Sequence, residues 1–486
     1  MNRTCAIIGG GVIGGGWAAR FLLNGWDVNI SDPDPESERK ISAVLENARR
    51  SLPGLSDVEM PDEGQLTYSA SIAEAVANAD WIQESVPERL DIKHRILAEV
   101  QAHCRKDAVI GSSTSGFKPS ELQHGAAKPE QIIVCHPFNP VYLMPLVEVV
   151  GGDGAAPETM RNASDVLASL GMKPLIVRKE IDAHIADRLL EAVWREGLWL
   201  IKDGIATTEE IDDAIRFGFG IRWAQMGLFE TYRVAGGEAG MAHFIAQFGP
   251  CLKWPWTKLM DVPELTDELV ERIAHQSDVQ SGMHSIRALE RIRDNNLVAM
   301  MRALKGQNWG AGALLNQQDA AMRAKNEQVP DLAQPIRTTA RTIPLDWVDY
   351  NGHMNEARYL QTFCDATDRF METVGCDADY IATGGSYFTA ETHIRHLGET
   401  HAGTRIYTTT QLLSGAGKKM HIFHKMVRND GTLLATGEHM LIHVSLETRR
   451  ASSPGPEIRA MLDTIETLHT KLPMPEGAGR AIAAKR

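Results

Sequence analysis

The chain has 486 residues, and its formal net charge of −13 reflects 63 acidic against 50 basic residues. At roughly 150 residues per domain, this length predicts about three domains, each large enough for its own core. The lysines and arginines form no basic stripe, which argues against nucleic acid or anionic membranes as partners. Six cysteines without a C-x-x-C pair predict reduced, mostly buried thiols. No apolar run reaches the ~20 residues of a membrane span and no signal peptide precedes the first strand, so we expect a cytoplasmic protein.

A glycine-rich turn follows the first predicted strand. The sequence Gly9-Gly10-Gly11-Val12-Ile13-Gly14 stands before residues 17–23, which have helical spacing. This G-x-G-x-x-G pattern between a strand and a helix is typical of dinucleotide-binding domains, because glycines allow a tight turn and a close approach of the pyrophosphate. The second strand, residues 27–31, leads into Asp32, whose carboxylate can bind the ribose hydroxyls and would repel a 2′-phosphate. The sequence therefore predicts a Rossmann domain that binds NAD through these residues.

Polar side chains follow two further predicted strands of this domain, which we place at residues 1–178. Glu88 comes after the strand 81–86, with Lys93 on the helix that starts there, and Ser115 follows the strand 108–113. Ligands of such sheets bind at the carboxyl ends of the strands, so all three are candidates for ligand contacts. The alternatives are a solvated helix start for Glu88 and Lys93, and a helix N-cap for Ser115.

His136 and Glu148 form the candidate catalytic pair. The apolar run 131–134 predicts a buried strand that leads into Cys135-His136-Pro137-Phe138-Asn139-Pro140, and residues 146–150 alternate like a second strand. The two side chains should therefore lie near facing ends of neighbouring segments. A carboxylate at one imidazole nitrogen raises the basicity of the other, which suits a base that takes a proton from an alcohol. The alternative is a core histidine with satisfied hydrogen bonds and a surface glutamate.

Together these motifs resemble the 3-hydroxyacyl-CoA dehydrogenase superfamily. The likeness rests on the glycine turn and on Ser113-Thr114-Ser115, His136-Pro137-Phe138-Asn139-Pro140 and Leu146-Val147-Glu148-Val149-Val150. It implies that His136 is the general base, that Glu148 is its partner and that Ser115 binds the substrate oxygen. It also places Glu88 and Lys93 near the nicotinamide end of the cofactor and the substrate.

Residues 179–325 predict an all-helical domain for substrate binding and dimerisation. Long apolar-periodic segments without a strand pattern predominate, at residues 185–201, 208–217 and 265–304. Asp187 stands where the resembling family usually carries an asparagine that touches the substrate. An anionic side chain there suits a cationic substrate, whereas the alternative is a salt bridge to Arg188 or Arg195.

Aromatic side chains concentrate in this domain and in the turn after His136. They are Phe138, Tyr142, Trp194, Trp199, Trp223, Phe229, Tyr232, Trp254 and Trp256. Aromatic faces bind quaternary ammonium groups by cation–π attraction, although an aromatic stripe at helical spacing is more often ordinary core. The candidate substrate contacts are Phe138, Asn139, Tyr142, Asp187 and Trp223. Residues 217–231 are similar to the branch of the family that acts on small free hydroxy acids.

The last part of the chain predicts one helix wrapped by an antiparallel sheet. Residues 326–335 are polar and bracketed by prolines, and we interpret them as a linker. A domain over 336–450 then begins with a strand and continues with a helix at 356–374. Four strands follow, at residues 386–395, 404–413, 418–428 and 432–445. The C-terminal tail, residues 451–486, contains a helical stretch at 458–471 to which we assign no function.

The stretch from Asp349 to Asn355 resembles the hot-dog acyl-CoA thioesterases of the hydroxybenzoyl-CoA type. It carries Asp349, Gly352, His353 and Asn355 just before the predicted helix. The likeness implies that Asp349 is the nucleophile or general base on the thioester carbonyl. It also implies that the other three residues shape the carbonyl site at the helix start, whose dipole favours an oxyanion, and that two subunits pair their sheets in a homodimer. The alternative for Asp349 and Asn351 is turn chemistry.

The combination of an α/β Rossmann domain, an all-helical domain and an α+β hot-dog domain resembles the bifunctional L-carnitine dehydrogenase/betainyl-CoA thioesterases. This likeness implies NAD-dependent oxidation of the 3-hydroxyl of L-carnitine to 3-dehydrocarnitine, hydrolysis of betainyl-CoA to betaine, and no metal. Other dehydrogenases with a fused acyl-CoA thioesterase are the first alternative, with L-gulonate or a 3-hydroxyacyl-CoA as the substrate. The second is a non-catalytic protein, either crystallin-like or CoA-sensing.

Overall fold

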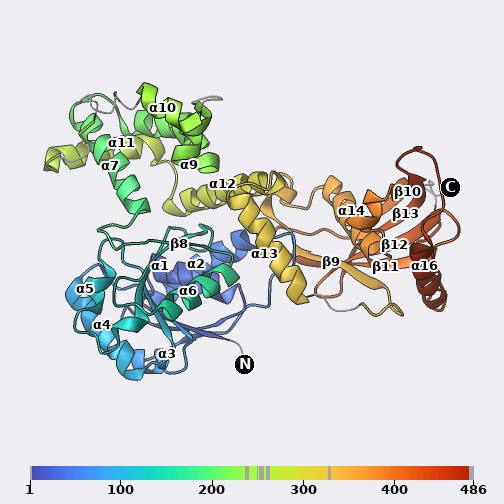
Figure 1. Ribbon diagram of the computed structural model, residues 1–486, viewed down its shortest axis with the longest axis horizontal. Coiled ribbons are helices and arrows are strands. Elements are labelled where there is room, and N and C mark those ends of the chain that lie inside the picture. The colour runs from blue at the N-terminus through green and yellow to red at the C-terminus, as the bar shows by residue number, and fades with distance from the viewer. Residues whose placement is uncertain are drawn as a thin grey trace. The chain divides into compact units, whose positions relative to one another are not determined.

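The computed structural model describes residues 3–235, 240–248, 250, 257–258, 263–326 and 330–480. The chain divides into two compact units, Met1–Leu52 with Pro61–Gln318 and Pro53–Met60 with Asp319–Arg486 (Figure 1). The finer domain boundaries that the sequence suggests, at residues 178, 325 and 335, stay predictions.

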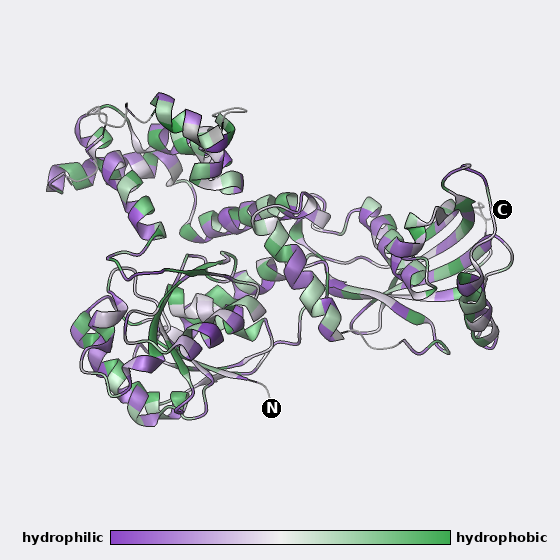
Figure 2. Ribbon diagram, in the orientation of Figure 1, coloured by the Kyte–Doolittle hydropathy of each residue, from purple (hydrophilic) through white to green (hydrophobic). Residues whose placement is uncertain are grey.

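The first unit contains an eight-stranded sheet in the order β3-β2-β1-β4-β5-β6-β7-β8. Its strands are β1 (Thr4–Ile8), β2 (Asp27–Ser31), β3 (Leu66–Tyr68), β4 (Trp81–Glu84), β5 (Val109–Ser112), β6 (Ile132–Pro137), β7 (Leu146–Val150) and β8 (Lys173–Ile176). Neighbouring strands are parallel, except that β6 and β7 run antiparallel. The central strands are almost continuously buried and hydrophobic (Figure 2), as expected for a sheet that helices cover on both faces.

The helices around this sheet are α1 (Val12–Leu22), α2 (Ser37–Ser51), α3 (Ile72–Val76), α4 (Leu90–His103), α5 (Pro119–Gln123) and α6 (Pro157–Ser169). The predicted Rossmann fold is therefore confirmed. One strand runs further than its apolar pattern suggests: β6 continues past Val134 because its pairing with β7 extends to Pro137 opposite Val147. Strands β3 and β8 escaped prediction, since three and four partly exposed residues are too short to show a period.

The described residues from 186 to the end of the first unit are mainly helical, as predicted. Its helices are α7 (Ala186–Lys202), α8 (Thr208–Asp213), α9 (Gly220–Ala235), α10 (Gly240–Phe248), α11 (Asp267–Ser281) and α12 (Ile286–Gly306), and α13 (Ala311–Asn326) begins in this unit and ends in the second. A π-helical turn, Ala214–Phe219, joins α8 to α9. The single predicted segment 265–304 is two helices, because the Ser285 hydroxyl accepts the Ala288 amide at 3.2 Å and starts a new helix there.

The second unit contains a five-stranded antiparallel sheet in the order β10-β13-β12-β11-β9. Its strands are β9 (Ile336–Thr342), β10 (Gly385–His396), β11 (Arg405–Ser414), β12 (Lys419–Arg428) and β13 (Leu433–Ser445), and its helices are α14 (Glu356–Thr373), α15 (Ala378–Ala382) and α16 (Pro456–His469). Helix α14 buries Phe363 and Phe370 against the sheet. Gly437 on β13 allows this approach, since a Cβ there would lie 2.7 Å from the Phe363 ring. The arrangement is that of the predicted hot-dog fold.

A short stretch from the first half of the chain belongs to the second unit. Residues Pro53–Met60 group with it, and their carboxylates pair with arginines of β9: Asp57 Oδ1 lies 2.8 Å from Arg341 Nη2, and Glu59 Oε2 lies 2.8 Å from Arg337 Nη2. The Arg341 side chain is buried and also lies over the Trp347 ring at 3.8 Å. The second unit is therefore assembled from two separated stretches of sequence.

Two expectations concern the chain as a whole. Across the described ranges, no helix is both long and apolar enough to cross a membrane. The cysteines that the structure describes are free thiols; Cys5, Cys135 and Cys376 are buried, whereas Cys364 is exposed. Trp254 and Trp256 lie outside the described residues.

Candidate active sites

The glycine turn after β1 has the geometry of a dinucleotide site. Gly9 has a φ of +99°, and a Cβ at Gly14 would lie 1.8 Å from the Gly9 carbonyl oxygen, so both positions require glycine. A Cβ at Gly11 would meet no atom within 4 Å, which leaves space where a pyrophosphate can approach. Helix α1 begins at Val12 and continues through Ile13, so the free amides of its first turn can bind phosphate.

Asp32 is held at this turn by two backbone amides. Its Oδ2 accepts a hydrogen bond from the Gly10 amide, and its Oδ1 accepts one from the Asp34 amide at 2.7 Å. The carboxylate therefore lies beside the turn on the end of β2, where an acidic side chain can bind the adenosine ribose. The residues present fit NAD, and their individual contacts with it remain predictions.

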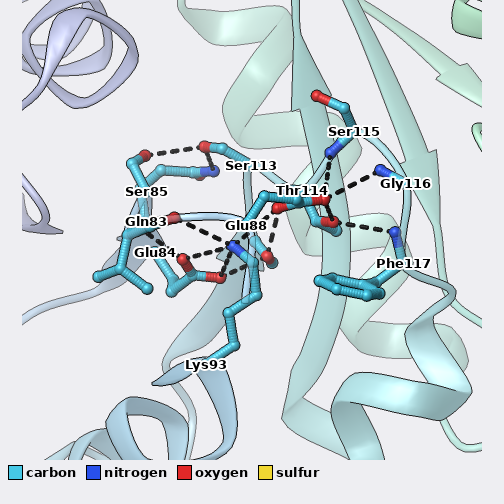
Figure 3. A network of polar contacts seen from close by, with 12 residues as sticks. Gln83, Glu84, Ser85, Glu88, Lys93, Ser113, Thr114, Ser115, Gly116 and Phe117 are labelled. Carbon is cyan, nitrogen blue, oxygen red and sulfur yellow. Dashed lines mark hydrogen bonds and ion pairs between the residues drawn. The ribbon is translucent and has the colours of Figure 1, made fainter. Parts of the chain in front are cut away.

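Lys93 is buried in a polar network beneath the ends of β4 and β5 (Figure 3). Its Nζ lies 2.9 and 3.1 Å from the two carboxylate oxygens of Glu84 and 3.3 Å from Glu88 Oε2. It also donates to the Val86 carbonyl oxygen at 3.3 Å. The Ser112 hydroxyl donates to the second oxygen of Glu84. A solvated helix start is therefore wrong for Lys93, whose ammonium group is surrounded by protein acceptors.

Glu88 connects this network to the loop that carries Ser115. Its Oε1 accepts hydrogen bonds from the Thr114 hydroxyl, from the Ser115 amide at 3.2 Å and from the Gly116 amide at 3.1 Å. Burial opposes the charged form of Glu88, but the Thr114 hydrogen bond, the Lys93 charge and the Gly116 amide together lower its pKa. The Ser115 hydroxyl points away from the network and is exposed (Figure 3). It is no helix N-cap, because α5 starts after Lys118.

His136 and Glu148 face each other across β6 and β7. They are direct partners in the strand register, and His136 Nδ1 lies 3.0 Å from Glu148 Oε2. Both side chains are buried, so the alternative of a surface glutamate is wrong. Glu148 Oε1 also accepts the Ile185 and Ala186 amides, each at 2.8 Å. Burial opposes the charged carboxylate, but hydrogen bonds from His136, Ala186 and Ile185 outweigh it and lower the pKa of Glu148.

Asp187 lies beside the other ring nitrogen of His136. Its Oδ2 is 3.6 Å from Nε2, and its side chain is 16% exposed. Burial raises the pKa of the Asp187 carboxyl, and the nearby Glu148 charge adds to this. In the described part of the chain, no salt bridge joins Asp187 to Arg188 or Arg195, so the alternative of a surface ion pair has no support.

Two more rings surround the catalytic histidine. The Phe138 ring meets His136 edge-on, with centroids 5.0 Å apart, and the His184 ring lies 5.7 Å away. His184 is fully buried, and this burial, followed by the proximity of His136, lowers its pKa. His184 was not among the residues predicted from the sequence. The one signal that could have found it is its position three residues before Asp187.

The other candidate substrate contacts are arranged differently. Tyr142 is buried, and its hydroxyl donates to Asp294 Oδ2 at 2.7 Å and accepts from Arg293 Nη2 at 3.2 Å, so its polar end is already bonded. Asn139 is exposed in the turn after β6. Trp223 in α9 packs on Phe219, the last residue of the π-helical turn, with centroids 4.5 Å apart, and the described contacts do not bring it to His136. A substrate role for these residues remains a prediction.

The second unit places Asp349 in the turn before α14. Its Oδ1 accepts the Asn351 amide at 2.8 Å and the His353 amide at 3.2 Å, so the carboxylate also performs the turn chemistry expected as an alternative. Gly352 has a φ of +80°, which favours glycine. The Asn355 side chain accepts the Ala357 amide at 3.0 Å and thereby caps α14. The turn fixes Asp349 at the positive end of a long helix.

A loop that sequence reasoning missed lies beside this turn. His353 Nε2 is 3.4 Å from Glu399 Oε2, and the His353 and His401 rings are 4.8 Å apart. His401 Nδ1 is 3.0 Å from the Gly352 carbonyl oxygen, and the Tyr359 hydroxyl donates to the Gly398 carbonyl at 3.2 Å. The hint in the sequence was a glutamate and two histidines within residues 396–401.

Three family models match parts of the chain. Residues 4–181 match the 3-hydroxyacyl-CoA dehydrogenase NAD binding domain, residues 184–272 match the corresponding C-terminal domain, and residues 343–462 match the thioesterase-like superfamily. A solved structure of 5-formyl-3-hydroxy-2-methylpyridine 4-carboxylic acid 5-dehydrogenase, an NAD+-dependent dismutase, has a TM-score of 0.53 and 26% identity. The aligned region covers 63% of this chain and 99% of the chain in that structure.

Two relatives are much more similar in sequence. The L-carnitine dehydrogenase/betainyl-CoA thioesterase of Ruegeria pomeroyi is 68% identical over 482 residues and covers 99% of each chain. The L-carnitine dehydrogenase of Mesorhizobium japonicum is 64% identical over 319 residues, which are 65% of this chain and 87% of that protein. The chain belongs to the family of L-carnitine dehydrogenase/betainyl-CoA thioesterases, which joins a 3-hydroxyacyl-CoA dehydrogenase-type NAD-binding half to a thioesterase-like half.

Proposed function

We propose that the first unit oxidises the 3-hydroxyl of L-carnitine to 3-dehydrocarnitine with NAD, and that the second unit hydrolyses betainyl-CoA to betaine and free CoA. The names of the relatives support both activities. One observation carries the choice of the first substrate: the partly buried Asp187 carboxylate lies 3.6 Å from the proton-accepting nitrogen of His136. Carnitine places a quaternary ammonium group on the carbon next to its carbinol carbon.

In the proposed oxidation, His136 is the general base. Glu148 accepts a hydrogen bond from Nδ1–H, which leaves Nε2 free to take the proton of the substrate hydroxyl. The charged imidazolium that results is stabilised by Glu148, whose own position is fixed by two amides at the start of α7. The exposed Ser115 hydroxyl binds the substrate oxygen as it becomes a carbonyl oxygen. NAD bound at the glycine turn supplies the hydride acceptor.

The charges around His136 favour a cationic substrate. Glu148 and Asp187 bring two carboxylates, and the described charged contacts of His136 are with these two alone. The Phe138 ring, with its centroid 5.0 Å from that of His136, places an aromatic side chain where it can contact methyl groups on nitrogen. L-Gulonate and 3-hydroxyacyl-CoA carry no such cation, so neither would gain from Asp187.

In the proposed hydrolysis, Asp349 acts on the thioester carbonyl as nucleophile or general base. The start of α14, capped by Asn355, directs its partial positive charge toward the oxyanion, and Gly352 and His353 shape the site. The proposal includes a cytoplasmic homodimer. Exposed apolar side chains such as Trp194, Phe217 and Phe229 in the helical part support a subunit contact.

The test is NADH formation at alkaline pH with L-carnitine, D-carnitine, L-gulonate and 3-hydroxybutyryl-CoA compared side by side. We expect activity with L-carnitine and little with the other three. Activity with gulonate or the CoA ester instead would overturn the proposed substrate while leaving the hydroxyl oxidation in place. Release of the CoA thiol from betainyl-CoA, followed with a thiol reagent, tests the second activity separately.

A further inference from the structure

His136 lies between two carboxylates that differ in how firmly they are held. Glu148 is fully buried and has three hydrogen-bond partners, namely His136 Nδ1 and the amides of Ile185 and Ala186. Asp187 lies in the first turn of α7, and its side chain is partly exposed. Among the described residues, His136 is the one ionic partner of Asp187. Glu148 is therefore the fixed carboxylate, and Asp187 is the one that can turn away.

The position of Asp187 conflicts with the role of the nitrogen beside it. To accept the hydroxyl proton, Nε2 must present a lone pair to the substrate. The Asp187 carboxylate 3.6 Å away can only accept, so it attracts a hydrogen on Nε2 and has none to offer a lone pair there. Asp187 in this position thus opposes the chemistry that His136 performs.

We propose that Asp187 restrains the base, and that the quaternary ammonium group of the substrate removes this restraint by drawing the Asp187 carboxylate away from Nε2. This inference rests on the proposed oxidation of L-carnitine. The cation and the hydroxyl sit on adjacent carbons, so a substrate whose hydroxyl faces Nε2 brings its cation close to Asp187. The hydroxyl proton then moves to Nε2 and the hydride moves to NAD, which leaves the carbonyl.

The groups that face His136 cannot remove the restraint by themselves. Glu148 on β7 is negative, and Phe138 is uncharged. His184, in the segment before α7, is buried, and this burial and the proximity of His136 lower its pKa, which disfavours a positive charge there. Among the described neighbours of His136, none offers a positive charge that could attract Asp187. The substrate itself is the cation that this site lacks.

A simpler role for Asp187 would be attraction of the cation alone, and one pair of substrates separates the two roles. The analogue 3-hydroxy-5,5-dimethylhexanoate keeps the carboxylate and the shape of carnitine but has an uncharged tert-butyl group in place of the trimethylammonium group. If Asp187 only attracts the cation, the substitution Asp187→Asn should not change oxidation of the analogue. If Asp187 also restrains His136, the same substitution should speed that oxidation, because the analogue cannot move the carboxylate.

The experiment measures kcat and KM for racemic analogue and L-carnitine with the wild-type protein, Asp187→Asn and Asp187→Ser. The matched control is Asp182→Asn, since the Asp182 side chain is 84% exposed and pairs with Lys118 at 3.3 Å. We expect both Asp187 variants to raise kcat with the analogue about fivefold to tenfold, and to lower kcat/KM with L-carnitine by about tenfold or more. We expect no change in kcat with either substrate in Asp182→Asn.

Three results would be decisive. An analogue kcat that stays constant or falls in both Asp187 variants, with unchanged melting temperature and NADH binding, overturns the restraint and leaves the proposed substrate intact. A wild-type protein that does not oxidise L-carnitine overturns the proposed function itself. An analogue kcat that rises equally in Asp182→Asn would assign the gain to general charge removal and would also overturn the restraint.

Discussion

The substitution Glu148→Gln tests how the carboxylate controls the catalytic histidine. Glutamine has the same shape, and its oxygen can still accept the two amides at the start of α7, which lie 2.8 Å from Glu148 Oε1. Its NH2 group then faces His136 Nδ1, now 3.0 Å from Glu148 Oε2, and donates where the carboxylate accepted. Nδ1 must become an acceptor, so the ring hydrogen moves to Nε2. The base then presents a hydrogen, not a lone pair, to the substrate hydroxyl.

The expected kinetic loss is much larger than the loss of stability. A positioned general base contributes about 10²- to 10⁴-fold, which corresponds to roughly 3 to 5 kcal/mol of activation free energy. The folded protein loses a charge at the start of α7 and one charge-assisted hydrogen bond, so we expect about 1 to 2 kcal/mol less free energy of unfolding. Most of the effect should therefore appear in kcat.

The assay is steady-state NADH formation from L-carnitine, with urea unfolding and NADH binding measured on the same samples. Glu180→Gln serves as the control, because Glu180 is a carboxylate that accepts the Ser120 amide at 3.0 Å without contacting His136. A Glu148→Gln protein that binds NADH normally and keeps kcat within about threefold of wild type, less than ~1 kcal/mol, would refute the reasoning.

Three further predictions concern the rest of the molecule. Lys93→Met leaves the fully buried Glu84 without its cation, so we expect the free energy of unfolding in urea to fall by about 3 to 5 kcal/mol, and a change below about 1 kcal/mol would contradict this. Burial lowers the pKa of His439 to about 4 and that of His424 well below its usual value. Because the unfolded chain binds these protons more tightly, stability should fall as the pH drops from about 6.5 toward 4, by about 3 kcal/mol for His439, and His439→Gln should flatten this slope in urea titrations at each pH. Asp349→Asn should slow betainyl-CoA hydrolysis about 10²- to 10⁴-fold while NADH formation from L-carnitine stays unchanged; equal loss of both activities would count against separate sites.

The parts of the fold and site that the sequence predicts are those set by local patterns. The glycine turn was predictable because strand, glycines and helix follow one another directly. His136 and Glu148 were predictable as a pair because their two strands are consecutive and antiparallel, which places them opposite each other in the register. The α14 start was recognisable because Asn355 caps it in the sequence itself.

What the sequence did not predict depends on contacts between distant segments. For Lys93 the sequence left a ligand contact and a solvated helix start as alternatives, and its burial depends on Glu84 and on Ser112, which comes from a strand that is adjacent only in space. The approach of Asp187 to His136 depends on where α7 begins. That start is held by hydrogen bonds from Ile185 and Ala186 to Glu148, between residues 37 and 38 positions apart. No periodicity or motif encodes such pairings.

Residues Pro53–Met60 belong to the second unit although they precede most of the first unit in the sequence. This matters for any attempt to express the thioesterase-like half on its own. A gene fragment that begins at the linker would encode the whole five-stranded sheet but would omit Asp57 and Glu59. The guanidinium group of Arg341 would lose its 2.8 Å partner, and Arg337 would lose its own. Poor yield of such a fragment would reflect a missing piece of its own structure, and not a requirement for the dehydrogenase. A better test of whether the second unit folds alone would include residues 53–60, either by circular permutation or as a tethered peptide.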